Sequence, residues 1–170
     1  MNVKNIYSLG AIVLVVALLW FFGSVNRTNP KTTSNLPKSD LASPLVAGEN
    51  LFFDFGNISM GAGNVSHVFK IVNTNKTAIV VSKIYTSCMC TVATLVTKAG
   101  RAGPFGMPGH ATIASINQSI APGEEASVEA VFDPAAHGPS GTGRVRRIIY
   151  LETDAQKEPF ELSFEANVTP

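Results

Sequence analysis

The sequence predicts an all-β protein, an antiparallel sandwich of about seven strands behind one N-terminal transmembrane helix. Two observations lead to this fold class. From residue 49 onward, short segments alternate apolar and polar residues and are separated by turn residues. Residues 6–25 form an apolar block without a charged side chain. No segment after residue 26 shows a helical period with caps, so we expect no helices between the strands.

The strand pattern is clearest where every second residue is apolar, because that period places one face of a strand toward a core. Three segments show it: 65–71, 126–132 and 160–168. The segments 78–86 and 145–153 are more continuously apolar, as expected for central strands. Together these segments predict one sandwich domain over 49–170.

Residues 6–25, IYSLGAIVLVVALLWFFGSV, have the length of a membrane span. About 20 helical residues cross the ~30 Å hydrocarbon core. A cleaved signal peptide usually has an apolar region of only ~7–15 residues and a small-residue cleavage site, which is missing here. We therefore expect residues 1–25 to be an uncleaved signal anchor, and the protein to be a single-pass protein of the cell membrane.

The segment 26–48 is rich in Asn, Thr, Ser and Pro, which predicts a flexible linker between the anchor and the domain. Basic residues after the anchor (Arg27, Lys31 and Lys38) favour a cytoplasmic domain by the positive-inside rule. Short N-terminal anchors, however, commonly present the following domain outside. We expect an extracytoplasmic domain, against the charge count.

Charge and motif content exclude several function classes. The chain has 13 basic and 12 acidic residues, which argues against a nucleic-acid partner. It contains no nucleophile elbow, P-loop, zinc-protease helix motif or dinucleotide-binding glycine set. We therefore predict that the protein is not an enzyme. The main functional hypothesis is a non-catalytic envelope protein whose exported domain binds or scaffolds a protein partner.

The segment 91–119 contains the Gly/Pro-rich stretch GRAGPFGMPGH, which we expect to pair poorly with other strands. It is interpreted as an inserted loop, with a small hairpin of Val92–Val96 and Ala111–Ile116 at its base. Loops of this length inside a domain are usually functional or mobile. The loop is therefore the expected adaptable surface for the partner.

Cys88 and Cys90 are the only cysteines. On a strand their side chains would share one face, with Cα atoms ~6.6 Å apart, near the upper limit for a disulfide. Three interpretations stay open. The pair could be two thiols that close the end of a strand, a strained disulfide capable of thiol-redox exchange, or half of a metal site.

The metal hypothesis adds loop residues to the two thiolates. His110 and Met107 lie in the inserted loop, and His137 lies in a second Gly/Pro-rich loop. Thiolate, thioether and imidazole ligands together suit Cu(I), with Zn(II) as the harder alternative. The hypothesis therefore names Cys88, Cys90, Met107, His110 and His137, and predicts that Cys88→Ser and His110→Ala each weaken Cu(I) binding. On the scaffolding interpretation no cofactor is needed.

Arg144, Arg146 and Arg147 form a basic cluster on a predicted strand, with Arg147 on the opposite face from the other two. The cluster could contact anionic lipid headgroups or an acidic partner. The alternative is cross-strand pairing with Glu161 or Glu165, which is the more common arrangement.

Three stretches of the sequence resemble a known bacterial family: FDFGNISMGAGNVSHVFKIVNTNKTAIVVSKIYTSCMCT, IAPGEEASVEAVFDP and FELSFEANV. The family is domain of unknown function 1573. The resemblance covers Leu51 to Val168, apart from the inserted loop. It implies an immunoglobulin-like sandwich, akin to major sperm protein and Hydin-type domains, and it implies export. The family pattern is Cys-Gly-Cys, and Met89 replaces the glycine here.

Overall fold

The computed structural model describes residues 45–47, 50–110 and 113–170. The predicted anchor over 6–25 and most of the predicted linker lie outside these residues. Among the described residues, no helix is long and apolar enough to cross a membrane.

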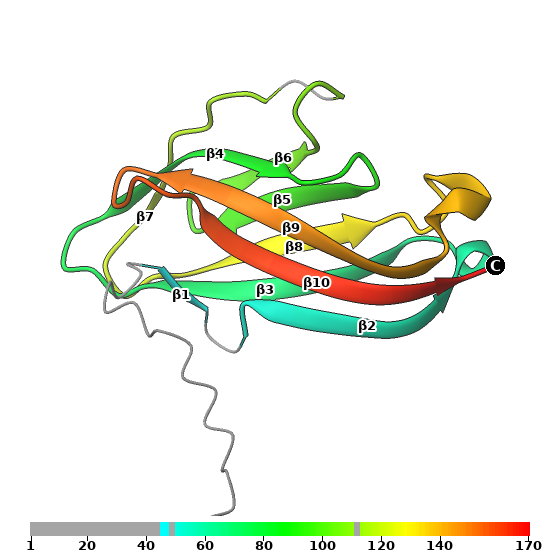
Figure 1. Cartoon of the computed structure of the whole chain (residues 1–170). Helices are drawn as coiled ribbons and strands as arrows, with labels where there is room; N and C mark the ends of the chain where they lie inside the picture. Colours follow the sequence, from blue (N-terminus) through cyan, green and yellow to red (C-terminus); the bar gives the residue numbers. More distant parts are fainter. Residues whose placement is uncertain (1–44, 48–49, 111–112) are drawn as a thin grey trace, which may run out of the picture. The chain divides into compact units, whose positions relative to one another are not determined.

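The described residues form two five-stranded sheets that pack as a sandwich (Figure 1). The strands of the first sheet, in spatial order, are β1 (Leu45–Ala47), β3 (Val65–Asn73), β8 (Glu125–Phe132), β5 (Thr91–Thr97) and β6 (Gly100–Phe105). Those of the second are β2 (Phe52–Ser59), β10 (Phe160–Thr169), β9 (Gly143–Thr153), β4 (Ile79–Thr86) and β7 (Gln118–Ile120). Two short 3₁₀ segments, Met60–Ala62 and Gly138–Gly141, complete the described elements. The prediction of an all-β sandwich is confirmed.

Alternation within the strands accounts for the core. In β8 every second side chain is buried, and in β10 the residues 160, 162, 164, 166 and 168 all face inward. Phe164 lies at the centre, with ring centroids 5.3 Å from both Phe55 and Phe132. One continuous apolar cluster between the two sheets therefore holds the domain together.

The first strand begins earlier than expected. β1 lies inside the segment predicted to be linker, and it pairs antiparallel with the end of β3, Leu45 opposite Asn73. Leu45 is only 1% exposed, so its burial against the core explains why this polar-flanked segment is ordered. Among the described residues, strand pairing therefore starts at residue 45 and not at 49.

The segment 91–119 was wrongly interpreted as an insertion, because its first part forms two strands. β5 lies between β8 and β6, and its hairpin partner is β6, not the segment 111–116. The glycines of β6 are compatible with pairing because it is an edge strand. At Gly103 the φ angle is +127°, and a Cβ atom would lie 2.9 Å from the carbonyl oxygen of Ala93, so only glycine allows this close approach.

One strand pair departs from the predicted antiparallel arrangement. β2 pairs with β10 in parallel, with Phe53 opposite Phe164. A parallel pair needs a long connection between its strands, and here almost the whole domain lies between them. Apolar and polar residues alternate in the same way in parallel and antiparallel strands, so the sequence pattern could not distinguish these two kinds of pairing.

Candidate metal and thiol site

Cys88 and Cys90 lie in the tight turn that joins β4 to β5, not on a strand as predicted. The hydroxyl of buried Thr86 lies 3.0 Å from the carbonyl oxygen of Cys88 and 2.9 Å from that of Thr91. The amide of Thr91 donates to the carbonyl of Cys88 at 3.2 Å. The turn is therefore closed by its own hydrogen bonds, and its curvature, not a strand pleat, brings the two sulfurs to one side.

The turn that contains Cys88 and Cys90 is hydrogen-bonded to both sheets. The amide of Ser87 donates to the carbonyl of Ile148 in β9 at 2.9 Å, and the hydroxyl of Ser87 accepts from the amide of Ile148 at 2.9 Å. On the other side, the amide of Asp133, just after β8, donates to the carbonyl of Cys90 at 2.9 Å. These bonds fix the turn against residues that are distant in the sequence.

His137 comes from the loop between β8 and β9. The carboxylate of Asp133 accepts a backbone amide at the start of this loop, and the hydroxyl of Ser140 donates to the carbonyl of His137 at 2.7 Å. Gly141 packs directly against the histidine: a Cβ atom there would lie 2.9 Å from the Cβ of His137. A compact turn with a required small residue therefore sets the position of this imidazole.

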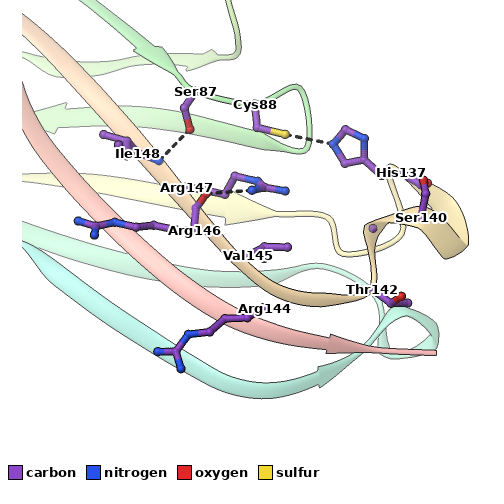
Figure 2. A pocket seen from close by; sticks show the side chains of 11 residues that line it. Ser87, Cys88, His137, Ser140, Thr142, Arg144, Val145, Arg146, Arg147 and Ile148 are labelled. Atoms are coloured by element: carbon purple, nitrogen blue, oxygen red, sulfur yellow. Dashed lines mark hydrogen bonds between the residues drawn. The ribbon is translucent and has the colours of Figure 1, made fainter.

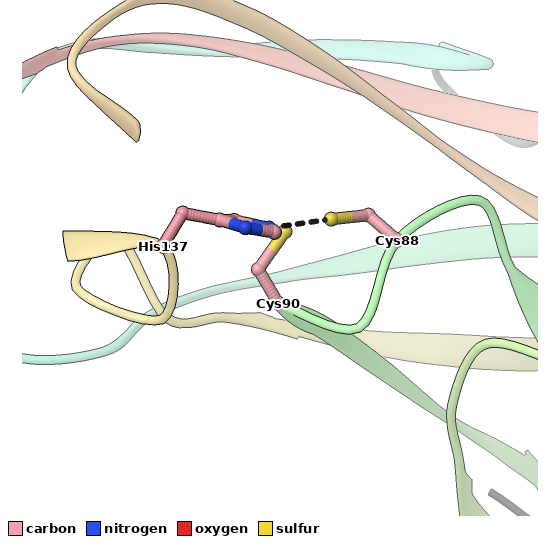
Figure 3. Close-up of side chains that lie close together, drawn as sticks. All are labelled: Cys88, Cys90 and His137. Carbon is pink, nitrogen blue, oxygen red and sulfur yellow. Dashed lines mark hydrogen bonds between the residues drawn. The ribbon is translucent and has the colours of Figure 1, made fainter. Parts of the chain in front are cut away.

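The two elements bring three ligand atoms together (Figure 3). Sγ of Cys88 lies 3.1 Å from Nε2 of His137, and these two atoms and Sγ of Cys90 all lie within 4.8 Å of one another. Both cysteines are free thiols. Bonds of ~2.0–2.3 Å from a metal to nitrogen and sulfur require such ligands to lie roughly 3.5–4 Å apart. To surround one ion, Cys88 and His137 would move slightly apart from 3.1 Å, and any separation near the 4.8 Å limit would shorten slightly.

Arg147 places a cation in direct contact with the cluster. Its Nε donates to Sγ of Cys90 at 3.0 Å, and its guanidinium lies 6.0 Å from the ring centroid of Phe132. Sequence reasoning did not connect Arg147 with the cysteines, which are 57 residues away. The available signal was its position in β9, on the opposite face from Arg144 and Arg146.

The pKa values of the two thiols are shifted in opposite directions. Burial raises the pKa of Cys88, but hydrogen bonds with Cys90 and His137 and the charge of Arg147 outweigh burial and lower that pKa to about 7. Burial and the hydrogen bond to Cys88 raise the pKa of Cys90, although Arg147 and Thr91 oppose the change. In the metal-free site, the first thiolate therefore forms at Cys88, the more exposed sulfur.

A pocket of about 680 Å³ opens beside the cluster (Figure 2). Cys88 and His137 form one end of it, and β9 forms one wall. Figure 2 shows the side chain of Arg147 pointing toward that end, whereas Arg144 and Arg146 point away from it. The three-residue cluster is therefore open to solvent on the pocket side.

The predicted ligand His110 is not part of this cluster, and Met107 does not line the pocket. Neither residue lines the pocket, and the cluster of described residues that could hold an ion contains only one histidine, His137. His110 is exposed, and its amide donates to the carbonyl of Met107 at 3.2 Å within a local turn. The structure thus assembles three of the five predicted ligands.

The predicted cross-strand pairing of the arginines is present for one of them. Arg144 forms an ion pair of 2.6 Å with Glu165 of β10. Arg146 contacts the hydroxyl of Ser163 at 3.4 Å. The cluster of arginines is therefore only partly neutralised by β10.

These features define a two-sheet β-sandwich with a Cys-x-Cys turn and a neighbouring histidine at one end. Residues 46–106 match the model of a family described as "Protein of unknown function (DUF1573)". The resemblance to this family is thereby confirmed over those residues. The match includes β5 and β6, which supports the correction that these strands are not an insertion. No curated protein matches the chain at a significant level.

A solved structure shares the fold. A protein of unknown function from Porphyromonas gingivalis W83 superposes with a TM-score of 0.51 at 14% identity, over 72% of this chain and 46% of that chain. This chain therefore spans less than half the length of that protein. At this identity, the likeness shows a shared fold and nothing about activity.

Two further likenesses are weaker. The VesB protease of Vibrio cholerae gives a TM-score of 0.49 at 13% identity, over 75% of this chain and 32% of that chain. A PapD-like domain of human CEP192 gives 0.42 at 12% identity, over 74% of this chain and 85% of that chain. Both TM-scores are below 0.5, so neither likeness supports a functional inference.

Proposed function

We propose that the domain binds a soft metal ion, Cu(I) in the first place, through Cys88, Cys90 and His137. One observation carries the proposal: three good ligand atoms, from two separate loops, lie within 4.8 Å of one another. Thiolate and imidazole are ligands for Cu(I) and Zn(II), and thiolate in particular selects soft ions. A lone loop histidine would not support this function, but one that contacts a cysteine sulfur at 3.1 Å does.

The charges around the cluster favour Cu(I) over Zn(II). Two thiolates and a neutral imidazole carry a charge of −2, so Cu(I) leaves −1, which the guanidinium of Arg147 offsets beside Cys90. Structural Zn(II) sites normally have four protein ligands. Among the described residues, the cluster has only three.

The wider prediction is an exported, membrane-anchored domain that serves a protein partner without catalysis. In support of a partner surface, three large apolar side chains near one sandwich edge are exposed: Leu51 (46%), Phe52 (43%) and Val68 (50%). We take the occupant to be an apolar segment of a protein partner. This surface replaces the segment 91–119 as the candidate, because β5 and β6 are ordered strands. Phe52→Asp should abolish capture of such a partner and leave metal binding unchanged.

Thiol-redox exchange is the other chemistry open to Cys88 and Cys90, since their two sulfurs belong to the same cluster and lie within 4.8 Å of each other. It is distinguished from metal binding by the thiol content of the purified protein. A metal-binding site keeps both thiols reduced and protected by the ion, whereas an exchange site cycles between a disulfide and two thiols.

The test is metal content of the full chain, purified in detergent without chelators. We expect one copper per chain by elemental mass spectrometry, or one Cu(I) taken up by the metal-free protein under anaerobic conditions. Cys88→Ser, Cys90→Ser and His137→Ala should each weaken Cu(I) binding at least tenfold. His110→Ala is the matched control and should bind as the wild type does. A chain that takes up neither Cu(I) nor Zn(II) would contradict the proposal.

A further inference from the structure

The pocket beside Cys88 and His137 is lined by basic side chains and by no acidic ones. Its charged residues are Arg144, Arg146 and Arg147, and no carboxylate lines it. Glu165 neutralises Arg144, and Arg147 is turned toward Cys90. Among the described residues, no carboxylate forms an ion pair with Arg146, which is exposed. Arg146 is therefore a cation of this pocket that no described carboxylate cancels.

The same pocket borders an open strand edge. β4 pairs with β9 only from Ile149 onward, and Ser87 alone reaches the preceding residue, Ile148. No described strand covers residues 143–147 on this side. Hydrogen-bonding groups alternate along a strand, so the backbone of Arg146 faces the pocket as that of Ile148 does. The carbonyl of Arg146 accepts from its neighbour Arg147 at 2.9 Å, which leaves the amide as an open donor.

We propose that this pocket binds a small acidic thiol peptide, and that such a peptide delivers Cu(I) to the cluster; the delivery step rests on the proposed function. Three features of the pocket match three features of this ligand class. The open edge of β9 offers a peptide backbone partner. Arg146 offers a charge for a carboxylate. The cluster at the far end accepts a metal ion carried by the thiolate.

The delivery step is a ligand exchange without electron transfer. The bond from Cu(I) to the carrier thiolate breaks as the bond to Sγ of Cys88 forms, and the ion stays Cu(I). The proton displaced from Cys88 passes to the released carrier thiolate, and the proton displaced from Cys90 passes to solvent. His137 and Cys90 complete the coordination, and the pocket side stays open for the carrier to leave.

The first experiment tests the pocket without metal. S-methylglutathione, whose sulfur is blocked, is titrated into the metal-free full chain in detergent and followed by calorimetry. We expect saturable binding that Arg146→Gln weakens at least tenfold. Arg101→Gln, which removes an arginine from the opposite sheet, is the matched control and should change nothing. The same peptide with both carboxylates amidated should bind at least tenfold more weakly.

The second experiment measures Cu(I) transfer. Transfer from the glutathione complex should slow at least tenfold in Arg146→Gln, while uptake from the acetonitrile complex should not change. Failure of all forms of the chain to take up Cu(I) from acetonitrile would end the metal proposal, and the calorimetry would still decide on the pocket. Absence of S-methylglutathione binding, or equal binding by the Arg146→Gln variant, overturns the inference even in a chain that binds copper.

Discussion

Nε of Arg147 donates a 3.0 Å hydrogen bond to Sγ of Cys90, and this contact joins the middle of β9 to the turn between β4 and β5. A permanent cation thus lies beside the more buried of the two sulfurs. If the site binds Cu(I) as proposed, this cation offsets the negative charge that the two thiolates keep. We therefore expect the contact to contribute to metal affinity.

Arg147→Gln should weaken Cu(I) binding about 10–100-fold, the usual effect of losing a partner that supports a metal ligand. The glutamine keeps a polar side chain but removes the charge. Affinity is measured by competition with a chromophoric Cu(I) chelator under anaerobic conditions. Arg101→Gln controls for the change in net charge. Equal affinities for both variants would show that the guanidinium has no part in the site.

Alkylation of the metal-free protein should depend on pH differently at the two cysteines. The pKa of Cys88 is lowered to about 7, so its reaction with iodoacetamide should be half-maximal near pH 7 and fall about tenfold per unit below it. The pKa of Cys90 is raised, so that residue should react only at more alkaline pH. Peptide mapping after brief labelling separates the two sites. If both cysteines reacted with the same pH midpoint, the expected difference between their pKa values would be wrong.

Gly141→Ala should damage the site while leaving the fold intact. The new methyl group would lie 2.9 Å from the Cβ of His137, so His137 or the loop that carries it must shift, and we expect the imidazole to lose its position beside Cys88. We expect at least tenfold weaker Cu(I) binding, with a thermal midpoint close to that of the wild type. Gly61→Ala is the matched control, because its added Cβ would meet its nearest neighbour at an ordinary 3.7 Å. Unchanged Cu(I) affinity in Gly141→Ala would mean that His137 is not a ligand.

Phe164→Ala should destabilise the sandwich by about 3–5 kcal/mol, the usual cost of a cavity left by a buried aromatic side chain. Phe164 is fully buried and contacts the rings of Phe55 and Phe132. The free energy of unfolding is obtained from urea titration followed by circular dichroism. Phe52→Ala, at a side chain that is 43% exposed, should cost much less. Similar losses of unfolding free energy in the two variants would show that Phe164 is not part of the core.

Local patterns in the sequence predicted most of the strands. The period of two in β3, β8 and β10 is a property of neighbouring residues, and it holds whatever the partner strand is. The pairing of β5 with β6 was not predicted, because glycine and proline disfavour strands on average but are tolerated at a sheet edge. The parallel pairing of β2 with β10 was also not predicted, because alternation carries no direction.

The sequence by itself determined the all-β class, the two cysteines as the centre of any soft-metal chemistry, and His137 as one of several candidate ligands. Only the tertiary structure decided that His137 and not His110 reaches Cys88, across 49 residues. It also decided that Arg147 lies beside Cys90. Both contacts arise from pairing between distant strands, β5 with β8 and β4 with β9, and non-local pairing leaves no periodic trace in the sequence.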